Sequence, residues 1–246
     1  MAAKRIILNK TEELQRIIAG RDKLYSVIAH DLRSPMGSIK MVLNMLMLNL
    51  PVEKIGGEMY ELLTMANRTT EDVFSLLDNL LKWTKSQIGN LNVVYQDVDA
   101  VEVVDSVIDV FNMVAGLKKI TIREEKPEKL PVCTDIDMLK TIIRNLLSNA
   151  IKFSNENSEV LVKMEEQGDT VVVSVKDSGC GIDEEGQKKL LHTDTHFSTF
   201  GTNNEEGSGL GLLLCQDFAV KSGGKLWFTS KKGEGSTFYF SIPLKK

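Results

Sequence analysis

The stretch VVVSVKDSGCGI, from Val171 to Ile182, decides the fold of the carboxyl-terminal half of the chain. Its β-branched run predicts a buried strand, which ends at Asp177 in a turn with Gly179 and Gly181. A carboxylate at a strand end can accept a hydrogen bond from an exocyclic amine, and glycines beside it let backbone approach a flat ring closely. DSG is also a common turn sequence, so an ordinary β-turn explains the same letters.

Further strands and helices surround this stretch. We expect strands at Val93–Val98, Ile120–Arg123, Val160–Glu165 and Thr170–Lys176, and a final hairpin in KLWFTSKKGEGSTFYFSI. We expect helices at Val101–Leu117, Ile136–Phe153, Glu184–Leu191 and Leu210–Val220. Helices and antiparallel strands in this mixture predict an α+β sandwich for residues 91–246.

Residues 1–90 show a different pattern, with two helical periodicities separated by the break NLPVEKIGG. The apolar stripes comprise Leu14, Ile17, Leu24, Ile28, Leu32, Ile39, Val42 and Leu46 in the first helix, and Leu62, Ala66, Thr69, Val73, Leu76 and Leu80 in the second. Two such helices form an antiparallel hairpin that cannot cover both stripes alone. We therefore expect a symmetric homodimer with a four-helix bundle, in which Val73, Leu76 and Leu80 lie between subunits. Packing of the hairpin on the chain's own second half is the alternative.

The composition narrows the class of protein. The chain has 246 residues, with 30 basic against 34 acidic side chains and a net charge of −4, which argues against a nucleic-acid-binding surface. The longest apolar stretch, Met41 to Leu50, is interrupted by asparagines and is too short to span a bilayer. No signal peptide is recognisable, and three scattered cysteines suggest a reducing compartment. We expect a cytoplasmic protein.

His30, in SVIAHDLRSP, is the first candidate for chemistry. At about 100° per residue, its side chain points away from the apolar stripe of the helix. Asp31 beside it is the obvious group to take a proton from the imidazole, and Pro35 follows where a proline should bend a helix. A surface histidine without a function is the simpler explanation of His30 taken alone.

The sequence RNLLSNAIKFS places Asn145, Asn149 and Lys152 on one stripe of a helix. Two amides and an ammonium suit a hard cation and the phosphates that it bridges. The same polar stripe could equally be the solvated face of the helix.

Two glycine motifs follow. EGSGLGLLLCQDF puts Gly207, Gly209 and Gly211 at the start of a helix, where free amides and the helix dipole favour phosphate. GEGSTF, residues 233–238, is a glycine turn within the final hairpin. Each motif is weak evidence by itself.

The order of the motifs is more specific than any one of them. A His-Asp pair on a helical hairpin, followed by NxxxNxxK, DxGxG, GxGLGL and GxGSTF, resembles the box sequence of sensor histidine kinases. The likeness covers nearly all of residues 10–244. It implies a dimerization and phosphotransfer hairpin (1–90), a catalytic ATP-binding domain (91–246), ATP and Mg²⁺ as cofactors, and a response-regulator receiver domain as partner. Because the first helix begins as if it continued from something upstream, we expect this chain to be part of a larger sensor kinase.

The resemblance also implies roles for single residues. His30 would be the phosphoacceptor and Asp31 the general base. Asn149 would coordinate Mg²⁺ with support from Asn145, and Lys152 would contact phosphate. The implied reaction is ATP-dependent autophosphorylation followed by transfer to an aspartate of the regulator.

Asp177 would read the adenine amine, next to Gly179 and Gly181. The remaining positions carried over from the family are the phenylalanine box, Phe197 and Phe200, and the hinge of the ATP lid, Gly207, Gly209, Leu210 and Gly211.

The sequence departs from the family pattern in two places. Residues 192–208 contain no Lys or Arg, which leaves Lys188 or Lys189 as candidates for contact with the terminal phosphate. Ser34 stands where the family usually has Thr or Asn, which predicts a phosphatase activity that is present but weak. Alternatively, the Ser34 hydroxyl only bonds the helix backbone.

Two other functions fit an ATP-binding domain of this kind. ATPases of chaperones, topoisomerases and mismatch-repair proteins use a glutamate four residues before the metal-binding asparagine, where this chain has Asn145. An amide cannot act as a base, which favours a kinase over a hydrolase. A degenerate kinase that serves as an ATP-binding dimerization scaffold is the other alternative. His192 and His196 around Asp194 could suggest zinc, but a loop without cysteine is a poor zinc site.

Overall fold

In the computed structural model, the described residues are Lys10, Ile28, 31–49, 56–87, 93–190, 201–202 and 209–244. The chain divides into two compact units, Met1–Asn92 and Val93–Lys246, and each has its own architecture. Within the described ranges, no helix combines the length and the apolarity needed to cross a membrane.

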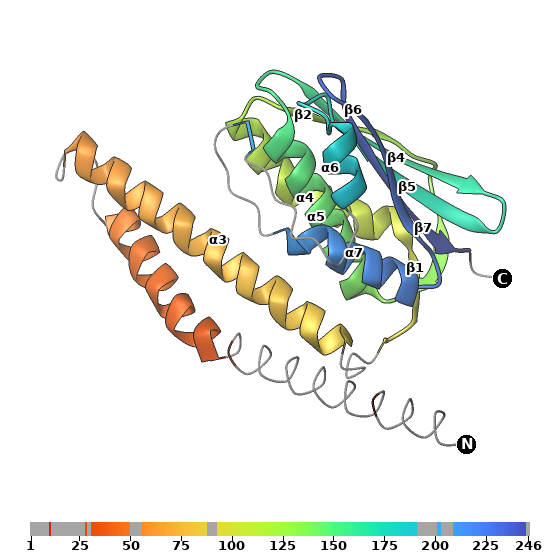
Figure 1. Ribbon diagram of the computed structural model, residues 1–246, viewed down its shortest axis with the longest axis horizontal. Helices are drawn as coiled ribbons and strands as arrows, with labels where there is room; N and C mark the ends of the chain where they lie inside the picture. Colours follow the sequence, from red (N-terminus) through yellow and green to blue (C-terminus); the bar gives the residue numbers. More distant parts are fainter. Residues whose placement is uncertain are drawn as a thin grey trace. The chain divides into compact units, whose positions relative to one another are not determined.

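The first unit contains a pair of helices (Figure 1). Residues 31–49 are helical throughout, Pro35 included. The second helix, α3, runs from Gly57 to Gln87, and Gly56 before it takes a positive φ of 78° that glycine tolerates at no steric cost.

The apolar contact between these two helices is small. Leu77 and Leu81 are buried, and their partly buried neighbours are Met36, Val73 and Leu80. Val73 and Leu80 pack on this pair while staying partly exposed, and Leu76 is 36% exposed, so the expectation that these three residues lie between subunits stays a prediction. The contact thus includes two members of the stripe expected from the sequence, Val73 and Leu80, while its buried pair lies one position after Leu76 and Leu80.

Ion pairs and cation–ring contacts add to the apolar contact between the two helices. Arg33 forms an ion pair with Asp78, and Lys40 pairs with Glu71 at 3.2 Å. Both cations also lie over the ring of Phe74, at 5.8 and 5.7 Å from its centre. These contacts join the two helices of the hairpin along one side.

The second unit is built on a mixed sheet of five strands in the order β2-β4-β5-β7-β6. The strands are β2 (Thr121–Glu125), β4 (Glu159–Gln167), β5 (Thr170–Lys176), β6 (Leu226–Lys231) and β7 (Gly235–Pro243). Only the β2–β4 pair is parallel among these neighbours. In the central strand, Val173 pairs with Met164 on one side and Phe240 on the other, and all three side chains are buried.

Helices cover one face of this sheet. They are α4 (Ala100–Leu117), α5 (Ile136–Phe153) and α7 (Leu210–Lys221), with the short α6 (Glu184–Lys189) near the end of β5 (Figure 1). Asp99 caps α4 and Asp135 caps α5, each through side-chain oxygens that accept backbone N–H groups. The unit is a helix-on-sheet sandwich, as expected.

One element was missing from the expected set. Strand β3 (Pro131–Thr134) pairs antiparallel with β1 (Gln96–Asp99) in a separate two-stranded sheet. Four residues that begin with proline carry too little alternation to be recognised in a sequence. Strand β1 also begins later than the expected Val93, because the Val94 N–H is bound to Asp135 at 2.9 Å and not to a strand.

Candidate functional site

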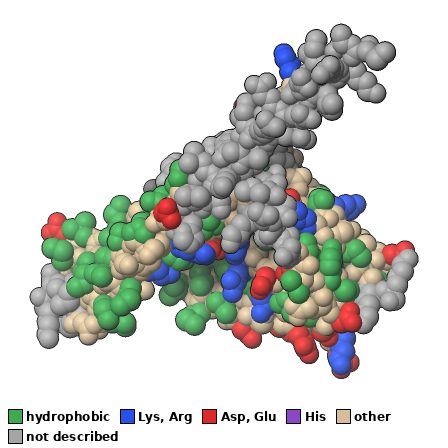
Figure 2. Space-filling view, turned by 90° about the horizontal axis from the view of Figure 1, so that it is seen from below, with side chains coloured by type: hydrophobic (Ala, Val, Ile, Leu, Met, Phe, Trp, Pro, Cys, Tyr) green, Lys and Arg blue, Asp and Glu red, His purple; other side chains and the backbone are tan. Residues whose placement is uncertain are grey.

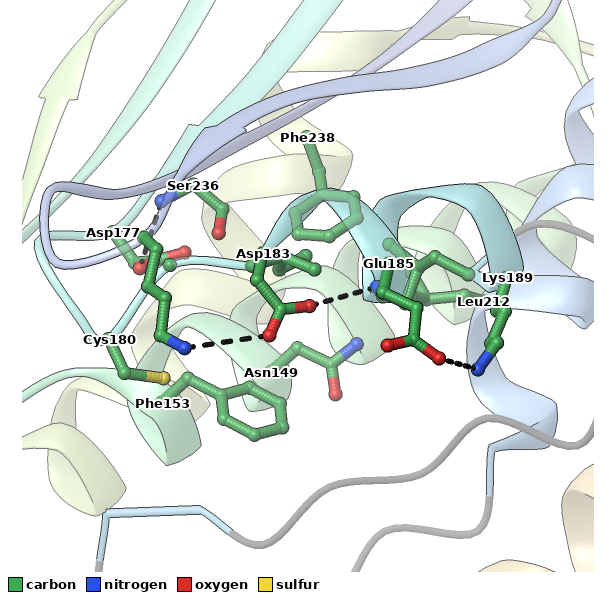
Figure 3. Close-up of a pocket in the computed structure, with 15 residues that line it drawn as sticks. Asn149, Phe153, Asp177, Cys180, Asp183, Glu185, Lys189, Leu212, Ser236 and Phe238 are labelled. Atoms are coloured by element: carbon green, nitrogen blue, oxygen red, sulfur yellow. Dashed lines mark hydrogen bonds and ion pairs between the residues drawn. The ribbon is translucent and has the colours of Figure 1, made fainter.

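A cavity of about 480 Å³ lies at the end of β5, between α5, α6 and the start of α7 (Figure 3). Its lining comprises Asn149, Phe153, Asp177, Cys180, Gly181, Ile182, Asp183, Glu185, Gly186, Lys189, Leu190, Leu212, Lys232, Ser236 and Phe238. The lining mixes apolar walls with a few charged groups, as small-molecule sites do.

Asp177 is the most deeply placed charged group of the cavity, with 4% of its surface exposed. Its Oδ1 accepts two backbone N–H bonds, from Gly179 at 2.9 Å and Ser236 at 3.2 Å. Burial raises the pKa of this carboxyl, and the two amide donors oppose that rise. Because Oδ1 takes both donors, Oδ2 is the oxygen left to accept a hydrogen bond from a ligand.

Asn149 and Phe153 line the cavity from the last turns of α5. Four residues apart, they lie on the same face of the helix. Figure 3 shows the Asn149 amide and the Phe153 ring beside the same open space. An amide oxygen here is a suitable ligand for a hard cation.

The other two members of the asparagine–lysine stripe lie outside the lining. The Asn145 amide donates to the Thr141 carbonyl at 3.0 Å, and its Oδ1 lies against the Cα of Gly211, where a Cβ would come within 2.7 Å. The Lys152 ammonium lies 4.9 Å from the centre of the Phe153 ring. In this structure, Asn145 joins α5 to α7 and Lys152 covers a ring of the pocket.

Gly179 and Gly181 are required by the backbone. A Cβ on Gly179 would come within 2.0 Å of the Phe153 carbonyl oxygen, and one on Gly181 within 2.0 Å of the Lys231 carbonyl oxygen. Gly181 also takes a positive φ of 61°. The sequence predicts that these glycines let the backbone approach a flat ring. In the structure, the absence of a Cβ lets each glycine pack against a neighbouring backbone carbonyl, that of Phe153 or that of Lys231.

The start of α7 forms another edge of the site. Gly209, the residue that precedes the helix, takes a φ of 67° and has no side chain with which to cap it. Leu210 and Gly211 begin the helix, and Leu212 reaches the cavity lining. Amides at a helix start favour an anionic group.

Charged residues of α6 and the last hairpin complete the rim. Lys189 pairs with Glu185 at 2.5 Å, and Lys232 lies 3.5 Å from Asp183. Asp183 also caps α6 by accepting the Gly186 N–H at 2.9 Å, which lowers the pKa of its carboxyl. Of the two lysines considered from the sequence, Lys189 is the one in the lining.

Several lining residues were not singled out from the sequence. Phe153 could have been found from its place one turn after Asn149, and Ile182 from its place beside Gly181. Ser236 and Phe238 belong to the GEGSTF turn, for which the sequence by itself predicts no role. Cys180, Leu212 and Lys232 carry no signal, because only the fold brings them to the cavity.

Some expected site residues lie outside the described part of the chain. These are His30, Phe197, Phe200, Gly207 and the possible zinc ligands His192, Asp194 and His196. Asp31 and Ser34 are described, and both are exposed on the helix of residues 31–49. In the ranges that the structure describes, no three His, Cys, Asp or Glu side chains gather as metal ligands.

Comparisons with known proteins identify the second unit. Residues 134–246 match the family of histidine kinase-, DNA gyrase B- and HSP90-like ATPases. The chain is 30% identical to the adaptive-response sensory kinase SasA of Prochlorococcus marinus over 97% of its own length and 61% of SasA. It is 33% identical to the sensor protein KdpD of Clostridium acetobutylicum over 99% of its own length and 27% of KdpD. The chain thus spans about three-fifths or less of these curated relatives.

Solved structures of histidine kinases share the fold of this chain. The catalytic domain of histidine kinase ThkA is 29% identical, with a TM-score of 0.53, and the match covers 61% of this chain and 97% of that domain. Full-length ShkA in complex with AMPPNP shares the fold at 21% identity and a TM-score of 0.69, over 91% of this chain and 46% of ShkA. The expected likeness is confirmed: the second unit carries a domain of the histidine kinase-, DNA gyrase B- and HSP90-like ATPases, and the chain as a whole is similar to the core of sensor histidine kinases.

Proposed function

We propose that this chain phosphorylates itself on His30 with ATP and passes the phosphoryl group to an aspartate of a response regulator. The observation that carries the proposal is the buried Asp177, whose Oδ1 is held by two backbone amides while Oδ2 stays available to a ligand. An exocyclic amine of adenine is a donor that this oxygen suits.

The ATP molecule would lie along the cavity. The adenine would sit at Asp177, between the glycine turn and the apolar side chains of Phe153, Leu212 and Phe238. The phosphates would extend toward Asn149 and the start of α7. Lys189 on the rim is a candidate for contact with the terminal phosphate.

Magnesium fits this arrangement. Asn149 offers a neutral amide oxygen in the lining, and the phosphates would supply further oxygen ligands, which Mg²⁺ prefers. Asn149 would hold the ion, and the ion would offset the negative charge that the phosphates carry during transfer.

The transfer itself needs a nucleophile and a base. An imidazole nitrogen of His30 would attack the γ-phosphorus, the bond from phosphorus to the bridging oxygen of the β-phosphate would break, and ADP would leave with that oxygen. The attacking nitrogen would be the unprotonated one, and Asp31 would take the proton of the other ring nitrogen as positive charge develops on the ring. The phosphohistidine would then pass its phosphoryl group to the regulator's carboxylate and return to neutral imidazole.

The position that activates water in the related hydrolases holds an amide in this chain. Asn145 occupies the position of the catalytic glutamate of the related hydrolases, and its amide is bound to Thr141 and packed on Gly211. This supports phosphoryl transfer to a side chain over hydrolysis. A scaffold that binds ATP without transfer is the second candidate, and the presence or absence of phosphohistidine separates the two.

The hairpin would provide the dimer. Apolar side chains that stay exposed in the single chain include Ile39, Val42, Leu46, Met59, Leu62 and Met65. Figure 2 shows hydrophobic side chains gathered over the hairpin in the left part of the view. A second copy would cover them in a four-helix bundle, so we propose residues 1–90 as the dimerization and phosphotransfer domain and residues 91–246 as the catalytic domain.

The proposal is tested by changing His30. We expect His30→Gln to abolish acid-labile, alkali-stable phosphate on the protein incubated with Mg-ATP, while the Kd for ATP changes less than about twofold, because the nucleotide pocket lies in the other unit. Phosphate that persists on the variant would contradict the assignment of His30. A wild-type protein that binds ATP but acquires no phosphohistidine would support the scaffold.

A further inference from the structure

The carboxyl end of α5 is held by groups from outside the helix. The last four carbonyls of an α-helix lack donors within it. In α5, the Ala150 carbonyl accepts the N–H of Ser154 at 3.0 Å, and the Phe153 carbonyl accepts the N–H of Cys180 at 3.4 Å. The two carbonyls between them, those of Ile151 and Lys152, are bound by a side chain that is remote in sequence.

That side chain is Lys118, which follows the last residue of α4 and is 7% exposed. Its ammonium donates to the Ile151 carbonyl at 3.0 Å and to the Lys152 carbonyl at 2.9 Å. A buried charge is costly unless it is hydrogen-bonded, and the negative end of a helix dipole is a place where an ammonium is favoured. Lys118 thus supplies the donors that the last turn of α5 lacks.

Thr202 joins the same group of oxygens. Its hydroxyl lies 2.5 Å from the Lys118 ammonium and 2.8 Å from the Ser154 carbonyl, and its N–H donates to the Lys152 carbonyl at 3.2 Å. Between Leu190 and Gly209, the described residues are Gly201 and Thr202. Thr202 is therefore the point at which the connection between α6 and α7 is seen to be tied to α5.

We infer that Lys118 and Thr202 form a clamp that positions the nucleotide pocket. The clamp holds the turn of α5 from which Asn149 and Phe153 enter the lining, and it ties to that turn the connection that leads to Leu212 on the other side. Neither Lys118 nor Thr202 lines the cavity, so both act through other residues. This inference rests on ATP as the ligand of the proposed function.

The test compares isosteric variants of the full chain. We would measure the Kd for Mg-ATP by calorimetry and the melting temperature without nucleotide for Lys118→Met, Thr202→Val and the double variant. Lys119→Met is the matched control, because this neighbouring lysine is exposed and loses the same charge. Thr202→Ser keeps the hydroxyl and serves as the conservative variant.

We expect each of Lys118→Met and Thr202→Val to raise the Kd roughly tenfold, as loss of a supporting shell does at other sites. The double variant should bind no more weakly than the weaker single variant, because both remove one cluster of contacts. Lys119→Met and Thr202→Ser should remain within about twofold of the wild type.

A lowered melting temperature with an unchanged Kd would show a purely structural role and would overturn the inference. Equal losses in Thr202→Ser and Thr202→Val would also overturn it. If Lys118→Met does not fold, the Kd values of Thr202→Val and Thr202→Ser still test the inference, because Thr202 is exposed and its variants leave the buried lysine in place. Altered affinities in a protein that never forms phosphohistidine would refute the kinase proposal and leave the clamp standing.

Discussion

The two units of the chain differ in how they bury apolar surface. In the second unit, side chains such as Val104, Ile143, Val173 and Phe240 are fully enclosed between the helices and the sheet. In the described part of the first unit, the buried apolar pair is Leu77 and Leu81, while Leu48 is 84% and Met65 is 68% exposed. A sandwich closes its own core, whereas a two-helix hairpin has more apolar faces than one neighbour can cover.

The first prediction concerns substitutions that disrupt the proposed dimer interface of the hairpin, and we expect their effect to be the largest. Leu62→Glu combined with Met65→Glu puts charges on an exposed apolar face of α3, and burying them in a bundle would be costly. We expect a monomeric mass by light scattering at micromolar concentration, against a dimeric mass for the wild type.

The matched control lies in the second unit. Met113 is 76% exposed on α4, so Met113→Glu makes the same kind of change on a surface that we do not assign to the dimer. It should leave the dimeric mass unchanged. Dissociation by Met113→Glu, with none by the hairpin variant, would move the dimer interface to the second unit.

The second prediction concerns the buried carboxylate of the second unit. Asp177→Asn keeps an oxygen for the Gly179 and Ser236 amides but places an NH₂ group where Oδ2 should accept from adenine. An unpaired buried donor costs about 1–3 kcal/mol, so we expect the Kd for ATP to rise roughly tenfold to a hundredfold. Wild-type affinity in a calorimetric titration would contradict the adenine assignment.

This substitution should not unfold the unit. Because burial raises the pKa of Asp177, its ionised form lowers the stability of the folded state at neutral pH, and Asn removes that cost. The melting temperature of Asp177→Asn should therefore equal or exceed that of the wild type at neutral pH. Asp169→Asn, in the exposed β4–β5 turn, is the control for loss of a charge.

The third prediction follows from the same pKa. A group whose folded pKa is raised takes up its proton earlier as the pH falls, so the acceptor form of Asp177 is depleted on acidification. The Kd of the wild type for ATP should rise by a few fold between neutral and mildly acidic pH, and the Kd of Asp177→Asn should rise less. Parallel pH profiles for the two proteins would assign the pH dependence to other groups.

The sequence predicted most of the second unit because its elements have distinct periods. Helix α5 and strand β5 have the expected bounds, since a cap residue, Asp135, and a β-branched run mark them clearly. It failed at β3, which is too short for a pattern. In the hairpin, the expected stripe contributes Val73 and Leu80 to the observed contact but omits its buried pair, Leu77 and Leu81.

The candidate site was predictable only in part. Asn149 and Asp177 belong to motifs whose residue types suit a cation and an amine, and both line the cavity. Asn145 and Lys152 belong to the same motif as Asn149, but Asn145 packs against Gly211 of α7 and Lys152 lies over the Phe153 ring. Helical spacing predicts which side of the helix a residue lies on, but not which neighbouring group its side chain contacts. Lys118 and Thr202 lie far apart in the chain, and no local pattern joins them to α5.

The last prediction returns to the hairpin and has the smallest effect. Ser34 lies four residues after His30, about one helical turn away, so its hydroxyl can reach the space beside a phosphorylated imidazole. In the helix, its carbonyl accepts the Ser38 hydroxyl at 3.2 Å, and no described residue is a hydrogen-bond partner of the Ser34 hydroxyl. An exposed hydroxyl can orient a water molecule, but serine lacks the methyl group that restricts threonine's rotamers. Ser34→Ala should therefore lower dephosphorylation of the partner regulator severalfold while His30 is still phosphorylated, and Ser34→Thr should raise it. Ser38→Ala, which removes the neighbouring hydroxyl, should leave the rate unchanged. Equal dephosphorylation rates in the wild type and both Ser34 variants would show that the hydroxyl has no part in the reaction.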